Sequence, residues 1–312
     1  MKILVIQKLA YACITLLLVA TLTFLLMKWI PGDPFQQEQA LPTAIYEALR
    51  EHYGFNDSLP SQYFHYLKQL VYFDLGPSFI HQGRSVASII KESMPISAAL
   101  GAQALLLAIP AGILLGTMAA LKKNRWQDYL TMFVAVIGIS MPSFILATLL
   151  QYILAIKLEL LPIARWGSLA QTILPTLSLA TLPIAFIARM VRTKMIEELR
   201  QDYIKTARAK GLSPLKIIFK HALRNTLIPV FSYLGQLTAN ILTGSFIVEK
   251  IFSIPGLGYW FVMSVLSRDY TLIMGITLFY SAVLLAIMFF VDIVCIILDP
   301  RIAHSIREGK LS

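Results

Sequence analysis

The stretch LAYACITLLLVATLTFLLM, residues 9–27, contains no charged side chain. A helix needs about 20 apolar residues to cross the hydrocarbon core of a bilayer. This run is too long for the apolar part of a typical signal peptide, and the following KWIP (28–31) offers no cleavage site of small residues. We therefore expect residues 1–30 to comprise a short N-terminal segment and a retained membrane span.

Further apolar runs of similar length follow along the chain. Of the 312 residues, 57% are hydrophobic and 14% are charged, a balance typical of membrane proteins rather than soluble domains. The sequence therefore predicts an all-α polytopic membrane protein with six transmembrane helices. Their approximate ranges are 9–30, 96–121, 129–156, 169–190, 226–248 and 272–298.

The distribution of basic residues predicts the orientation. If the N-terminus lies inside, 18 of the 27 Lys and Arg residues fall in inner segments. Cytoplasmic loops of membrane proteins carry such an excess, so we expect both termini and the loop 191–225 in the cytoplasm. The net charge of +10 then needs no nucleic-acid partner. The expected organisation is a span (1–30), an extracytoplasmic segment (31–93), a transmembrane core (94–298) and a cytoplasmic tail (299–312).

The outer segment has its own helical pattern. TAIYEALREHYGF (43–55) and SQYFHYLKQLVYF (61–73) are each amphipathic, and NDSLP (56–60) separates them. Their many aromatic side chains are typical of a membrane-interface belt. Before the last span, SIPGLGYW (253–260) predicts a turn-rich loop with Trp260 at the interface.

The loop 191–225 predicts two short helices that meet at a corner. Apolar residues recur every four positions up to Ala207, and Gly211 stands where a helix often ends in a left-handed residue. Ser213-Pro214 is a typical restart. The second helix would place one apolar face opposite a basic one. The apolar face comprises Leu215, Ile218, Phe219, Ala222 and Leu223, and the basic face comprises Lys216, Lys220 and Arg224.

Three interpretations fit this basic loop to different degrees. A loop lying on anionic lipid explains the charge but not the glycine corner. A DNA-binding helix-turn-helix must enter a groove, which two spans attached at its ends hinder. A rigid corner that presents apolar residues to a groove on a cytosolic protein agrees best with the pattern.

The loop resembles the EAA loop of ABC-transporter permeases, in the variant of the oligopeptide, dipeptide and nickel branch. The matching stretches are YIKTARAKGLS (203–213) and HALRN (221–225), although Lys205 and Arg224 replace the Glu and Pro of the general pattern. The likeness continues through IPGDP (30–34), FDLGPSF (73–79), SMPSF (140–144), ARMVRTKM (188–195), EKIFSIPGLGYW (249–260), SRDY (267–270) and LDPRI (298–302). The long outer segment is similar to that of the B-type permease.

The resemblance implies a type I ABC importer permease in a bacterial inner membrane. It implies as partners a homologous second permease, two ATP-binding subunits, an extracytoplasmic substrate-binding protein and a peptide substrate. The loop would couple to an ATP-binding subunit through Tyr203, Ala207, Gly211, Leu212, Leu215 and His221. The chain lacks a phosphate-binding G-x-x-x-x-G-K-[ST] motif and zinc-spaced His or Cys, so we expect a non-enzyme without a cofactor. The alternative is an ATP-independent secondary transporter or channel.

A few intramembrane residues stand out from the apolar background. Pro142, Pro175 and Pro183 remove helix hydrogen bonds and can kink a span. Pro142, Gln151, Gln236 and Asn240 are candidates to line a translocation path. Gln151, Gln236 and Asn240 could instead join helices through hydrogen bonds, as polar residues in spans often do. Asp292 needs a partner, a cavity or the interface. The sequence does not distinguish oligopeptide, dipeptide and nickel as substrate.

Overall fold

The structure of the chain is a computed structural model, and it describes residues 2–29, 43–52, 54–81, 83–242 and 245–298. These residues form helices, without a strand apart from an isolated bridge between Pro77 and Ser85. Four helices among them are long and apolar enough to cross a membrane, or five if one bent pair counts as a span. The all-α membrane class is thus confirmed, and the number six stays a prediction.

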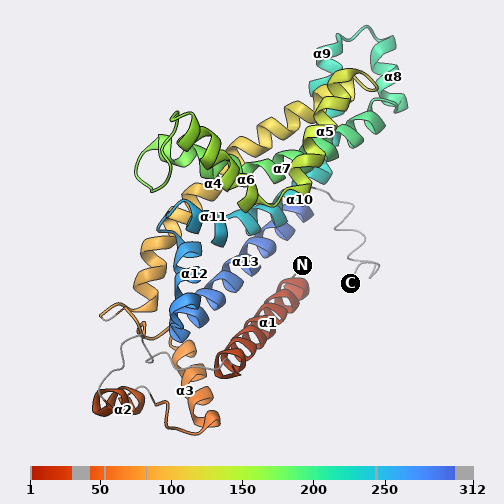
Figure 1. Cartoon of the computed structure of the whole chain (residues 1–312). Helices are drawn as coiled ribbons and strands as arrows, with labels where there is room; N and C mark the ends of the chain where they lie inside the picture. Colours follow the sequence, from red (N-terminus) through yellow and green to blue (C-terminus); the bar gives the residue numbers. More distant parts are fainter. Residues whose placement is uncertain (1, 30–42, 53, 82, 243–244, 299–312) are drawn as a thin grey trace. The chain divides into compact units, whose positions relative to one another are not determined.

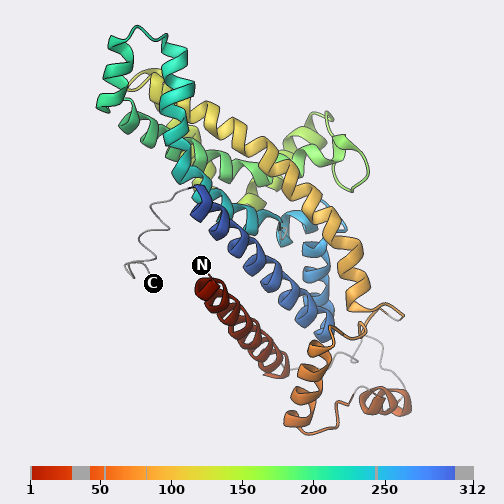
Figure 2. The same ribbon diagram turned by 180° about the vertical axis from the view of Figure 1, so that it is seen from behind.

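The chain divides into two compact units (Figures 1 and 2). The first comprises the described residues of 1–97 and 255–285. Its helices are α1 (Lys2–Trp29), α2 (Thr43–His52), α3 (Leu59–Val71), the start of α4 (Val86–Leu121), α12 (Leu257–Ser267) and the first part of α13 (Tyr270–Leu298). The two predicted amphipathic helices are confirmed as α2 and α3.

The connection before the last span was expected to be a loop, and this is wrong in part. After the turn at Ser253–Gly256 the chain forms α12, which ends at Arg268 in a left-handed conformation with φ +58°. Trp260 lies in α12, where its ring meets His81 edge-on at 5.0 Å and Arg84 stacks over it at 5.1 Å. Trp260 also packs against the buried apolar cluster of this unit, so it contacts both the outer segment and the core.

One buried carboxyl group ties the outer segment to α13. Asp269 has no exposed surface and precedes α13. It accepts hydrogen bonds from the Ser78 hydroxyl and from the amides of Phe79 and Leu272, both at 3.2 Å. The Thr271 hydroxyl lies 3.0 Å from the same carboxylate, but its proton goes to the nearer Pro77 carbonyl at 2.6 Å. The turn at 74–79 is therefore fixed to the helix start by side-chain and backbone donors together.

The second unit comprises the described residues of 98–254 and those from 286 onward. It contains the rest of α4, α5 (Trp126–Ser140), α6 (Ser143–Leu150), the π-helix η1 (Gln151–Lys157), α7 (Leu169–Glu198), α8 (Asp202–Ala209), α9 (Pro214–Lys216), the π-helix η2 (Ile217–Ala222), α10 (Leu223–Leu242), α11 (Phe246–Ile251) and the end of α13.

Small residues let α4 and α7 approach closely, and Figure 2 shows the two helices side by side. A Cβ atom added to Gly116 would lie 2.5 Å from the Ala188 carbonyl oxygen, nearer than real Cβ atoms come. Gly112 is similarly close to Ile187, at 2.7 Å. Such small-residue contacts are the usual means by which membrane helices pack backbone to backbone.

The third expected span is broken at Pro142. α5 ends at Ser140, Pro142 caps α6, and the two helical segments bend by 105°. Pro175 and Pro183 behave differently, because α7 runs through both without interruption and buries them. The helix is thus interrupted at Pro142, whereas Pro175 and Pro183 leave α7 continuous.

Several expectations remain untested by the described residues. The predicted fifth span, 226–248, corresponds to α10, which is not among the four or five candidate spans. Most of IPGDP (30–34) and LDPRI (298–302), and the tail 299–312, lie outside the described residues.

Candidate functional site

The loop between α7 and α10 forms the predicted corner, which we call the basic corner (residues 202–225). Figure 1 shows α8 and α9 joined by a turn beyond the end of α7. Gly211 has φ +72°, the Gly211 amide bonds the Arg208 carbonyl, and the Leu212 amide bonds the Ala207 carbonyl. This pair of hydrogen bonds is the Schellman motif, which ends a helix with a left-handed residue. The predicted left-handed cap is confirmed.

The requirement for glycine at this turn is conformational. A Cβ atom added to Gly211 would meet nothing within 4 Å, so space does not exclude a side chain. In a left-handed residue other than glycine, the Cβ atom lies too close to the following carbonyl oxygen. This crowding costs roughly 1–2 kcal/mol. The next helix begins where the sequence predicted it, because Ser213 is extended and Pro214 is the first residue of α9. The Ser213 hydroxyl, however, makes no capping hydrogen bond.

The inner side of the corner packs against the end of α7. A cluster of buried residues forms there, and partly buried apolar side chains, among them Leu199 and Leu212, pack against it. Its members are Ala120, Met195, Ile204, Ala207, Ile217 and Ala222. Ala207 and Leu212 thus stiffen the corner from within, because both belong to this contact.

The apolar face predicted for the second helix is wrong in its register. Residues 217–222 form a π-helix, in which hydrogen bonds join residues five apart. Ile217 and Ala222, separated by five positions, are the buried pair. Leu215 and Phe219 instead remain exposed, with 67% and 59% of their surface accessible. Two large apolar side chains, Leu215 in α9 and Phe219 in the π-helix, therefore stay outside the buried cluster.

A polar cluster joins the two ends of the corner. The Tyr203 hydroxyl donates to the Glu198 carboxylate, and Asn225 donates to the Tyr203 oxygen at 3.0 Å. Burial, with the Glu198 hydrogen bond second, raises the pKa of Tyr203 above its ordinary value. The hydroxyl therefore stays protonated at neutral pH and can donate. The sequence pattern did not indicate Glu198 or Asn225, because their pairing crosses 27 positions.

The other predicted residues lie in different surroundings. His221 is half-buried within the π-helix. Gln151 donates to the Ile163 carbonyl at 2.6 Å, so its amide braces the following loop rather than another helix. Gln236, Asn240 and Asp292 lie in α10 and α13, but their side chains fall outside the described part of the chain.

The sequence analysis did not predict an ion pair that joins α5 to α7. Arg192 binds the nearly inaccessible Asp128 carboxylate with two nitrogens, one of them at 2.7 Å. The Asn124 amide donates to the same carboxylate at 3.0 Å. Sequence spacing could not reveal this pair, because 64 positions separate its members.

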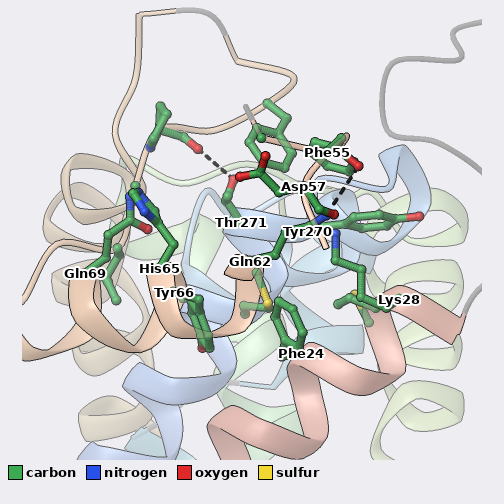
Figure 3. A pocket seen from close by; sticks show the side chains of 18 of the residues that line it. Phe24, Lys28, Phe55, Asp57, Gln62, His65, Tyr66, Gln69, Tyr270 and Thr271 are labelled. Carbon is green, nitrogen blue, oxygen red and sulfur yellow. Dashed lines mark hydrogen bonds between the residues drawn. The ribbon is translucent and has the colours of Figure 1, made fainter. Parts of the chain in front are cut away.

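The first unit contains a cavity of about 410 Å³, shown in Figure 3. It lies among the last turns of α1, the helix α3, the turn at 74–79 and the start of α13. Gln62 donates to the Phe55 carbonyl at 3.3 Å, and Thr271 to the Pro77 carbonyl at 2.6 Å. The Lys28 ammonium stands 4.5 Å from the centre of the Phe55 ring. The lining thus combines aromatic faces with polar side chains from α3.

Tyr66 gives this cavity a buried hydroxyl without a hydrogen-bond partner among the described residues. Burial raises its pKa to about 12, so the group is neutral under ordinary conditions. Across the described ranges, no three or more His, Cys, Asp and Glu side chains are grouped as metal ligands.

Comparison with known proteins agrees with these features. Residues 112–304 match the model of the family described as binding-protein-dependent transport system inner membrane component, and residues 1–101 match the model of its N-terminal part. The dipeptide transport system permease protein DppB of Bacillus subtilis (strain 168) is 51% identical over 288 residues, covering 92% of this chain and 94% of the relative. The oligopeptide transport system permease protein OppB of Salmonella typhimurium is 42% identical over 292 residues, covering 93% and 95%.

Proposed function

Because the chain belongs to the family of binding-protein-dependent transport system inner membrane components, we propose that it is the permease subunit of an ATP-driven peptide importer. The names of its relatives support a dipeptide or oligopeptide substrate. The chain would cross the inner membrane six times, with both termini in the cytoplasm. A homologous second permease would complete the path, and two ATP-binding subunits and an extracytoplasmic binding protein would complete the importer.

The observation that carries the coupling proposal is the exposed apolar pair on a rigid corner. Leu215 and Phe219 point away from the buried cluster, and Tyr203 is partly exposed beside Glu198. An apolar side chain in a groove of a partner is the usual anchor of such an interface. We infer that Leu215 and Phe219 contact the ATP-binding subunit, while Gly211, Ala207 and Leu212 hold the corner in shape.

The mechanism follows from this division of roles. Closure of the ATP-binding subunits would push the basic corner, and the buried cluster would pass that displacement to α7 and α10. The spans would then move between inward-open and outward-open states. Nucleotide and peptide can shift this equilibrium only by binding the two states with different affinity.

Copurification tests the docking surface. The variant Leu215→Asp/Phe219→Asp should lose the ATP-binding subunits in mild detergent while the permease itself is recovered, since charges are poorly accommodated in an apolar groove. Phe64→Asp is the matched control, because Phe64 is 71% exposed on α3 of the other unit. Recovery of the ATP-binding subunits with both variants would argue against this surface. Uptake by the chain without any such subunit would favour the ATP-independent transporter.

A further inference from the structure

A second cavity of about 410 Å³ opens among α4, α5 and α7. Its walls are apolar side chains such as Met118, Leu130, Val134 and Ile184, with small residues at Ala135 and Ala188. Leu130 and Val134 are more than half exposed, at 52% and 55%, so the cavity is a groove on the surface of the helices. In a chain that spans a bilayer, such a groove faces hydrocarbon or another apolar body.

Among the polar residues that line the groove, Gln127 has an atom without a partner. Its Oε1 atom is buried and accepts no hydrogen bond from any described residue. A buried acceptor without a partner is unfavourable. A turn of the Gln127 amide into the groove would let a ligand hydroxyl donate to this atom and recover that cost.

Three cations stand at the same end of the groove. Lys122 follows Met118 by one helical turn, and Arg125 directly precedes Trp126, which lines the groove. Lys122, Lys123 and Arg125 are exposed, and none forms a salt bridge with the described acidic residues. The carboxylate in the first turn of α5, Asp128, is already held by Arg192. The mouth of the groove therefore carries a net positive charge.

We propose that this groove binds an anionic phospholipid whose headgroup carries hydroxyls, such as phosphatidylglycerol. The acyl chains lie along Leu130, Val134 and Ile184, the phosphate meets Lys122, Lys123 and Arg125, and a headgroup hydroxyl donates to Gln127. A helix of a partner subunit would match the apolar wall but not the cations. The site does not depend on the importer function, and in the proposed orientation its lipid comes from the cytoplasmic leaflet.

Native mass spectrometry of the full-length chain in mild detergent tests the headgroup end. Titration with phosphatidylglycerol should give a retained lipid that phosphatidylcholine does not replace. The variant Lys122→Gln/Lys123→Gln/Arg125→Gln should bind it on the order of a hundredfold more weakly, from the usual contribution of a basic residue beside anionic lipid. The control Lys210→Gln/Lys216→Gln/Lys220→Gln removes the same charge from the basic corner and should change binding little.

Photo-crosslinking tests the apolar end. Phosphatidylglycerol with a diazirine in its acyl chain should label α5 and α7 around the groove, and Leu130→Phe or Ala135→Leu, which fill it, should reduce the labelling severalfold. Gln127→Leu should weaken binding of phosphatidylglycerol more than that of phosphatidic acid, because phosphatidic acid lacks the headgroup glycerol and its hydroxyls. Equal binding of phosphatidylcholine, equal effects of the two triple variants, or crosslinks from this face to a second permease would each overturn the proposal.

Discussion

Single residues decide two turns in the described part of the chain. Gly211 ends α8 in a left-handed conformation that no crowding enforces. Asp269 accepts hydrogen bonds from three donors, on Ser78, Phe79 and Leu272, at one buried carboxyl group. At Gly211 the missing side chain permits the turn, and at Asp269 the side chain itself holds the turn. Substitutions at these two positions therefore test the local backbone geometry without changing the packing of the helices.

At Gly211, the variants Gly211→Val and Gly211→Asn should behave differently. A β-branched residue strongly resists φ +72°, whereas Asn adopts the left-handed region more readily. We expect Gly211→Val to fold but to transport less peptide per ATP hydrolysed, because the displaced corner no longer drives α7. Reconstituted importer, assayed for uptake and ATP hydrolysis together, gives the ratio. Equal coupling in the two variants would mean that the turn conformation is unimportant.

At Asp269, replacement by Ala should loosen the turn at 74–79 from α13. The lost acceptor leaves buried donors unpaired, and the expected loss of unfolding free energy is on the order of 3 kcal/mol. Faster hydrogen exchange at the Phe79 amide should accompany it. Ser78→Ala removes one donor and should cost less. If Asp269→Ala leaves exchange at Phe79 unchanged, the hydrogen bonds to Asp269 do not hold this turn.

Whole elements are positioned by contacts far apart in the sequence. The pair Asp128–Arg192 joins α5 to α7, and glycines on α4 let α7 approach it closely. The π-helix η2 buries Ile217 and Ala222 and leaves Phe219 exposed, as Leu215 is in α9. These contacts determine which faces stay free for a partner or for lipid.

For the pair Asp128–Arg192, removal of one member should cost more than removal of both. Arg192→Ala leaves the Asp128 carboxylate buried and unpaired. We expect the free energy of unfolding to fall by about 2 kcal/mol. This is less than the roughly 3–5 kcal/mol lost when a fully buried pair is broken, because 25% of the Arg192 side chain is exposed. Asp128→Ala/Arg192→Ala should recover part of it. Thermal unfolding of the purified variants measures this order, and a double variant less stable than Arg192→Ala would contradict it.

The molecule as a whole is a membrane-embedded set of helices. Four or five of its described helices qualify as spans, and the basic residues gather in the segments expected inside. The predicted fifth span, 226–248, and the orientation follow from apolar length and charge distribution rather than from any contact within the chain. They are therefore properties to be measured on the intact membrane.

Cysteine labelling in cells should reveal the orientation and the number of spans. In a background where Ser replaces Cys13 and Cys295, Asp57→Cys and Ser253→Cys should react with an impermeant maleimide from outside. Lys123→Cys and Lys216→Cys should react only after the membrane is opened. All four positions are exposed. Labelling of Ser253→Cys from the inside would remove one of the six predicted crossings.

The sequence alone determined the helical membrane class, the helices α2 and α3, the family, and the turn at Gly211. Each follows from composition, order along the chain or patterns within about ten residues, where backbone preference and side-chain periodicity act directly. Only the tertiary structure decided the register of η2, the position of Trp260 in α12, and the pairs Asp128–Arg192 and Ser78–Asp269. These depend on which distant surfaces pack together, because a buried polar group must find its partner wherever the fold brings one.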